Sequence, residues 1–117
     1  MAESIMREKA KKFAIRIINL NKFLRNKKDL VISNQILRSG TSIGANLSEG
    51  EFAQSESDLI NKSQIALKEA NETRYWLELL VETNYISQEQ FDSLHKDCVE
   101  LINMLVRGII TLKGDKI

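Results

Sequence analysis

Four runs of apolar residues, each repeating at intervals of three and four positions, account for almost the whole chain. Such spacing puts the apolar side chains on one face of an α-helix, because a helix completes a turn in 3.6 residues. In the first run, over residues 3–26, the repeat consists of Met6, Ala10, Phe13, Ile17, Leu20 and Leu24. The second run covers residues 30–52, the third begins at Ser55, and the fourth extends from Ser87 to residue 112. Four helices that each bury one face predict an all-α protein.

The connections between these helices are short, and two helices have recognisable first residues. Residues 27–29 join the first two helices, and residues 83–85 form a tight turn before the fourth. Ser55 with Asp58, and Ser87 with Gln90, have the spacing of helix-capping pairs. Proline is absent and glycine occurs five times, unlike a loop-rich or all-β domain. Because short connections make neighbouring helices antiparallel, residues 1–117 are expected to form one domain, an antiparallel up-down-up-down four-helix bundle.

The size of the chain and its single cysteine limit the function classes. A chain of 117 residues can build one core but has little left for a deep substrate cleft. One cysteine excludes an intramolecular disulfide and fits a reducing cytoplasm. No apolar run approaches the roughly 20 residues that span a bilayer, and the first residues lack the pattern of a signal peptide. We therefore expect a cytoplasmic protein with no membrane partner.

Side chains that could carry chemistry are few. His95 is the only histidine, and with Asp92 it forms a single acid-x-x-His pair, whereas helical di-metal centres use two such pairs and further carboxylates. Cys98 lies in the apolar repeat of the fourth helix, where a small buried hydrophobic residue is expected. We therefore expect no metal, no cofactor and no enzymatic activity.

Residues 35–50, QILRSGTSIGANLSEG, combine a helical apolar stripe with small and polar residues that an ordinary helix does not need. The inward stripe consists of Ile36, Gly40, Ile43 and Leu47. A second row beside it consists of Arg38, Ser42, Asn46, Glu49 and Gly50.

This second row resembles the R-x3-S-I-x2-N-[IL]-x-E-G signature of four-helix-bundle proteins of the 23S rRNA intervening-sequence (S23) type. Residues 65–80, IALKEANETRYWLELL, look like the third helix of that family. The family has no established reaction. The related accessory protein of diversity-generating retroelements is a barrel-shaped pentamer that binds nucleic acid and its reverse transcriptase. The resemblance thus implies a homo-oligomer, a pentamer by analogy, with a nucleic-acid or protein partner.

The polar row of the second helix needs hydrogen-bond partners wherever it is buried. The side chains expected to be buried and hydrogen-bonded are Ser42, Asn46 and Glu49. Glu69, Glu72 and Arg74 on the third helix could pair with Arg38 across the bundle, and a structural salt bridge or interface network is expected there instead of an acid–base site.

Candidate subunit contacts come from two features. The fourth helix has a second apolar line, which consists of Val99, Ile102, Val106 and Ile109. Gly40 and Gly44 of the second helix would allow another helix to approach closely. The apolar line is either a wide core face or a subunit interface, and the sequence leaves both open.

The two parts of the chain carry opposite charge. Residues 1–38 contain 10 Lys and Arg against 3 acids, net +7, and residues 39–117 contain 7 against 13, net −6. The candidate phosphate contacts are Lys9, Lys12, Arg16, Arg25, Lys27 and Lys28. These cations either contact RNA or DNA, which makes binding depend on salt, or are solvated or paired with acidic faces of the third and fourth helices. Two function classes stay open, a nucleic-acid-binding accessory protein and a structural or protein-binding adaptor.

Overall fold

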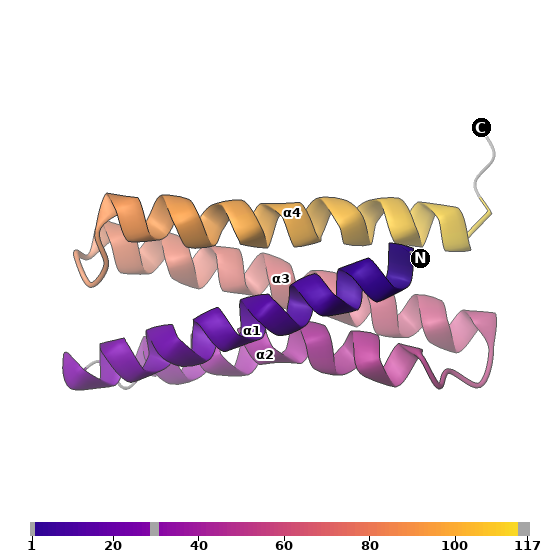
Figure 1. Cartoon of the computed structure of the whole chain (residues 1–117), viewed down its shortest axis with the longest axis horizontal. Helices are drawn as coiled ribbons and strands as arrows, with labels where there is room; N and C mark the ends of the chain where they lie inside the picture. Colours follow the sequence, from indigo (N-terminus) through magenta and orange to yellow (C-terminus); the bar gives the residue numbers. More distant parts are fainter. Residues whose placement is uncertain (1, 29–30, 115–117) are drawn as a thin grey trace.

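The computed structural model describes residues 2–28 and 31–114, and in these ranges the chain forms four helices and no strand. Their bounds are α1 (Ala2–Asn26), α2 (Val31–Gly50), α3 (Glu56–Glu82) and α4 (Gln88–Leu112). Figure 1 shows successive helices running in alternating directions along one long axis. Each helix packs against the next, and α1 also contacts α4, although less extensively than it contacts α2. The all-α four-helix prediction is confirmed.

Side-chain caps define the first residues of α3 and α4. Ser87 and Gln90 form a complete capping box, in which Gln90 N–H donates to Ser87 Oγ (3.1 Å) and Ser87 N–H donates to Gln90 Oε1 (2.8 Å). Ser55 caps α3 by accepting from Asp58 N–H (3.0 Å). The Asp58 carboxylate, however, accepts from the backbone of Gln54, so this second box is not reciprocal.

The turn between α3 and α4 is equally well defined. Asn84 adopts a left-handed conformation (φ 66°), which asparagine tolerates better than most residues. Its N–H donates to the carbonyl of Val81 (3.2 Å), and Tyr85 N–H donates to the carbonyl of Leu80 (2.9 Å). This pair of bonds is a Schellman motif, which satisfies the last carbonyls of α3. The predicted tight turn at residues 83–85 is confirmed.

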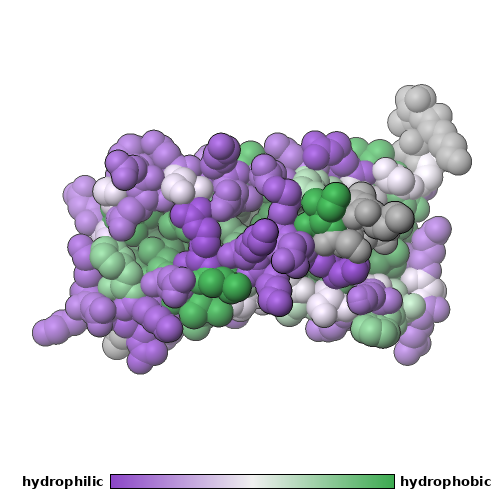
Figure 2. Space-filling model, viewed as in Figure 1, coloured by the Kyte–Doolittle hydropathy of each residue, from purple (hydrophilic) through white to green (hydrophobic). Residues whose placement is uncertain are grey.

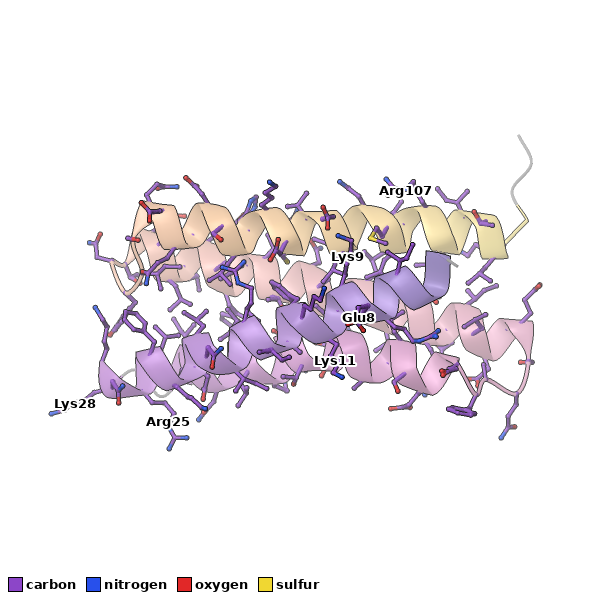
Figure 3. All side chains as sticks on the ribbon, in the orientation of Figure 1. Glu8, Lys9, Lys11, Arg25, Lys28 and Arg107 are labelled. Carbon is purple, nitrogen blue, oxygen red and sulfur yellow. The ribbon has the colours of Figure 1, made fainter. Side chains whose placement is uncertain are left out.

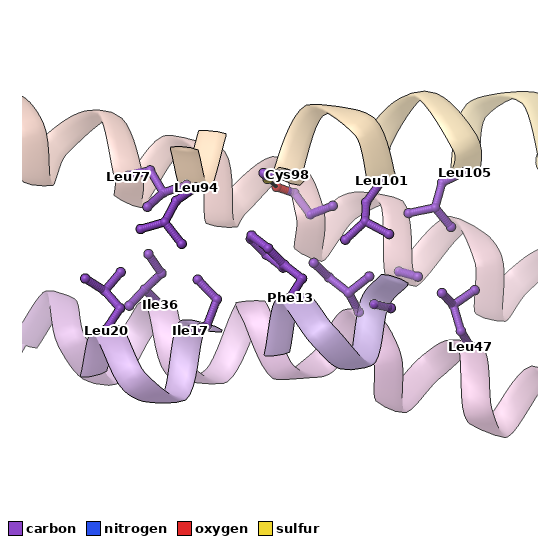
Figure 4. Packing of buried hydrophobic residues seen from close by; sticks show 14 of the residues in the cluster. Phe13, Ile17, Leu20, Ile36, Leu47, Leu77, Leu94, Cys98, Leu101 and Leu105 are labelled. Carbon is purple, nitrogen blue, oxygen red and sulfur yellow. Dashed lines mark hydrogen bonds between the residues drawn. The ribbon is translucent and has the colours of Figure 1, made fainter. Parts of the chain in front are cut away.

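The core lies along the bundle axis and consists of the predicted apolar stripes. All six members of the first stripe are buried, from Met6 to Leu24. Figure 4 shows Phe13 of α1 pointing toward Cys98 of α4, with Ile17 further along α1 on the side of Leu94. A buried hydrogen bond from the Thr73 hydroxyl to Ser39 Oγ (2.8 Å) links α3 to α2 within this apolar interior.

At Gly40, α2 packs closely against a side chain of α1. A Cβ atom at this position would lie 2.8 Å from both γ-carbons of Ile17, a buried and stiff side chain. The helix that Gly40 allows to approach closely is therefore α1 of the same chain. This corrects the assignment of Gly40 to a subunit interface. Gly44 faces Ala10 at an ordinary distance and is only half-buried, so its interface role stays a prediction.

The second apolar line of α4 divides between core and surface. Ile109 is buried, which corrects its assignment to a subunit interface, and the half-buried Ile102 packs against the core. Val106 is 39% exposed, and Ile110, outside the predicted line, is 47% exposed. The line is thus partly a wide core face, and it still leaves apolar surface on α4.

Candidate functional site

The cations of α1 fall into two sets, because the helix turns some of them toward α4. Lys9 Nζ lies 2.5 Å from Glu100 Oε1, and Arg16 Nη1 lies 2.7 Å from Asp97 Oδ2. Arg16 also donates from Nη2 to Ser93 Oγ (2.8 Å). Lys9 and Arg16, the paired cations, are therefore neutralised by α4.

The pairing has an electrostatic signature at Lys9. Its hydrogen bond to Glu100, with the attraction of the same carboxylate, raises the pKa of the Lys9 ammonium above its ordinary value. The sequence left open whether Lys9 and Arg16 contact phosphates or pair with an acidic helix face. In the structure both pair with carboxylates of the fourth helix.

Apart from Arg7, which lies 3.7 Å from Glu51, the remaining cations of α1 and of the turn after it point to solvent. They are all exposed, and no carboxylate of the described residues lies within ion-pair distance of any of them. This set, the open basic face, consists of Lys11, Lys12, Lys22, Arg25, Lys27 and Lys28. In Figure 3, Lys9 extends toward α4 and Lys11 extends over α2, whereas Arg25 and Lys28 extend away from the bundle. Lys27 Nζ lies 5.0 Å from the centre of the Phe23 ring, in cation–π contact.

Two members of this face, Lys11 and Lys22, were not among the candidates chosen from the sequence. A signal was present, because separations of 11 and 14 residues return to nearly the same side of a helix. Lys22 and Arg25 lie 11 and 14 residues after Lys11. The three cations therefore share one side of α1.

A shallow groove of about 520 Å³ runs between α1 and α2 beside Lys11. Its other cation, Arg7, lies 3.7 Å from Glu51. The α2 wall is made of small or hydroxyl residues, Thr41, Gly44, Ala45 and Ser48. The only acid in α2 is Glu49, whose carboxylate is held by Lys62 of α3 (3.0 Å). No carboxylate of α2 therefore offsets the charge of Lys11 or Arg25.

The signature row of α2 lies along α3. We call the row, together with its partners on α3, the signature face; the row consists of Arg38, Ser42, Asn46, Glu49 and Gly50. The Arg38 guanidinium donates to both Glu69 oxygens (3.1 and 3.2 Å) and to Glu72, and this bonding raises the pKa of Arg38. Of the three α3 side chains that the sequence offered as partners of Arg38, the structure pairs it with Glu69 and Glu72.

The other signature residues differ from expectation. Ser42 donates to the Arg38 carbonyl (2.6 Å), and Asn46 donates to the Ser42 carbonyl (2.9 Å), so the backbone of α2 itself satisfies them. Both are half-buried, and Glu49 is exposed, which corrects the prediction that this row is buried. Gly50 is buried, and a Cβ atom there would lie 3.2 Å from Leu59 Cδ1.

The few residues with possible chemistry are held in structural roles. Cys98 donates its S–H to the Ala70 carbonyl (3.3 Å), and burial raises the pKa of its thiol to about 12. His95 stacks on Phe91 with 4.8 Å between ring centres. Within residues 2–28 and 31–114, no three His, Cys, Asp or Glu side chains converge as metal ligands.

A second cavity, of about 660 Å³, opens at the end of the bundle where α1 and α3 begin. Its lining is mainly apolar, with Met6, Leu47, Leu59 and Met104 among its walls, and it does not include His95. In the described part of the chain, no helix has both the length and the hydrophobicity that a membrane span needs.

The chain matches a known family over nearly its whole length. The sequence model of the 23S rRNA-intervening sequence protein family matches residues 2–107. A crystal structure of a protein of unknown function from the S23 ribosomal protein family of Bacteroides thetaiotaomicron is 55% identical. The similarity covers 93% of this chain and 98% of that one, with a TM-score of 0.91. Comparison with curated proteins gives no match. The polar row and the four-helix fold agree with the family match, and the chain belongs to the family of 23S rRNA-intervening sequence proteins.

Proposed function

We propose that the protein is a non-enzymatic accessory protein that binds RNA or DNA through the open basic face of α1. The observation that carries the proposal is the set of six exposed cations with no carboxylate partner among the described residues. Such cations contact phosphates favourably because binding releases the counterions condensed on the nucleic acid. Contacts of this kind fix position on the backbone and carry no sequence preference.

The surroundings of this face support the proposal. Lys11, Lys22 and Arg25 share one side of α1, and α2 brings no unpaired acid to that side. Figure 2 shows small hydrophobic patches among hydrophilic residues on the side of the bundle that carries α1. Ile15 and Ile18 are 50% and 38% exposed on α1, so a docked partner also covers apolar surface. The family's name refers to intervening sequences of 23S rRNA, which favours RNA or its gene over an unrelated polyanion.

We infer that the acting form is a homo-oligomer, a pentamer by resemblance. Val106 and Ile110 leave apolar surface on α4 that a second subunit would cover. An oligomer repeats the open basic face, and linked weak contacts strengthen one another through effective concentration. Light scattering should give a particle of several 13.4 kDa chains, and a monomer at micromolar concentration would contradict this inference.

A structural or protein-binding adaptor is the second candidate. The same exposed apolar residues of α4 favour it, since they fit a protein partner as well as a second subunit. The adaptor requires no contact between α1 and phosphate.

Binding titrations by fluorescence anisotropy distinguish the two candidates. The probes are labelled single-stranded RNA, duplex RNA and duplex DNA, from about 50 to 200 mM salt. The triple variant Lys11→Gln, Lys22→Gln, Arg25→Gln should weaken binding and make the log–log salt slope for duplex DNA shallower by about 2 to 3.

A matched control removes the same charge elsewhere. Lys68, Lys96 and Arg107 are exposed cations of α3 and α4, and their change to glutamine should leave the slope nearly unchanged. Equal weakening by both triple variants would point to net charge alone. If the wild-type protein retains none of the three probes at about 50 mM salt, the nucleic-acid proposal fails and the adaptor stands.

A further inference from the structure

The paired cations, Lys9 and Arg16, lie next to one member of the open basic face, Lys12. Lys9 lies three residues before Lys12 and Arg16 lies four residues after it, so the three share one side of α1. Lys12 is exposed and has no partner among the described residues. A phosphate held by Lys12 would therefore lie next to two further cations whose donors already contact carboxylates of α4.

Those carboxylates occupy the donors that a phosphate would use. Arg16 contacts Asp97 (2.7 Å) and both the hydroxyl and the carbonyl of Ser93 (2.8 and 3.3 Å). Lys9 contacts a single acceptor, Glu100. Oxyanions of carboxylate and phosphate compete for the same charged donors, with similar geometry.

The ion pairs are open to exchange because solvent reaches them. The four side chains keep between 39% and 47% of their surface exposed. Exposed ion pairs contribute little stability and are screened by salt. Breaking either ion pair should therefore leave the bundle folded.

We propose that Asp97 and Glu100 are intramolecular competitors of phosphate, which keep Arg16 and Lys9 out of the nucleic-acid interface until a phosphate displaces them. This inference rests on the proposed function of the open basic face. The exchange replaces one anion by another at the guanidinium and the ammonium, and no covalent bond changes. Asp97 and Glu100 lower the affinity of Lys9 and Arg16 for a short anion. They therefore favour a nucleic acid long enough to contact Lys22 and Arg25 as well.

Isosteric removal of the two carboxylates tests the inference. In the double variant Asp97→Asn, Glu100→Gln, the paired cations become available, and the salt slope for duplex DNA should steepen by up to about 1.8. The gain in affinity over wild type should then be about tenfold larger at 50 mM than at 200 mM salt. Thermal unfolding followed by circular dichroism checks that the variant remains folded.

The control double variant makes the same change of net charge on a helix that does not contact α1. Glu78→Gln with Glu82→Gln on α3 should leave affinity and slope close to those of wild type. If both double variants tighten binding alike, or if neither changes a measurable wild-type affinity, the inference is overturned while the proposed function stands. If no form of the protein binds nucleic acid at about 50 mM salt, both are overturned.

Discussion

The signature face and the open basic face both place charged side chains beside an apolar seam, but only the first is compensated. Arg38 is held by Glu69 and Glu72, and Glu49 is held by Lys62. Six cations of α1 and of the turn after it have no carboxylate partner among the described residues. A compensated row favours a structural or subunit contact, whereas an uncompensated row leaves charge available for a polyanion. The family signature therefore does not coincide with the proposed nucleic-acid interface.

The largest expected effect on stability concerns the contact between Gly40 of α2 and Ile17 of α1. Gly40→Ala would push α1 away, because the added methyl group would meet the γ-carbons of Ile17 at 2.8 Å. We expect the free energy of unfolding to fall by about 1 to 3 kcal/mol. Gly44→Ala is the control, since its methyl group meets Ala10 at 3.6 Å and helix propensity adds up to about 1 kcal/mol. Urea unfolding measures both, and equal stability of the two variants would refute the close contact.

A smaller effect on stability should distinguish the signature face from the open basic face. Arg38→Ala leaves Glu69 and Glu72 next to each other without a cation, and should cost about 1 kcal/mol at low salt. Lys11→Ala on the open basic face should change stability by less than about 0.5 kcal/mol. Urea unfolding measures both variants with and without added salt. Added salt should reduce the stability cost of Arg38→Ala and leave that of Lys11→Ala unchanged. A cost of the same size for Lys11→Ala would mean that the open basic face is compensated after all.

Alkaline pH should weaken the stability contributed by two ion pairs, Lys9–Glu100 and Lys62–Glu49. Hydrogen bonds to Glu100 and Glu49 raise the pKa values of Lys9 and Lys62 above 10.5 in the folded state. Their contribution to stability is therefore complete below pH 10.5 and is lost as the pH rises through the raised values. The melting temperature of wild type should exceed that of Glu100→Gln at pH 8, and the difference should narrow as the pH rises above 10.5. A difference that is constant with pH would contradict the pairing of Lys9.

The smallest effect is expected at Asn46. Its amide donates only to the Ser42 carbonyl of its own helix, so Asn46→Leu should change the free energy of unfolding by less than about 0.5 kcal/mol. Light scattering on the same variant adds a second measurement. A smaller particle with unchanged unfolding would assign the signature face to a subunit interface, and a large loss of stability would show that Asn46 has a partner beyond α2.

The bundle itself was predictable because its determinants are local. Apolar spacing predicts the buried stripe of α1, and the pair Ser87–Gln90 predicts the first turn of α4 through bonds three residues apart. The pairing of Arg38 with α3 was also predictable, since α2 and α3 are adjacent in the chain and carry opposite charges at matching positions. These interactions depend on helix periodicity and on neighbours in sequence.

The roles of Lys9, Arg16, Gly40 and Ile109 were not predictable in the same way. Periodicity assigns each residue to a side of its own helix, but it does not say which helix covers that side. Asp97 lies 81 residues from Arg16 and Glu100 lies 91 from Lys9, so only the packing of α1 on α4 brings these charges together. The sequence by itself determined the four helices and the excess of positive charge on α1. The tertiary structure decided which of those cations are neutralised, because an ion pair depends on distances between helices that no local pattern specifies.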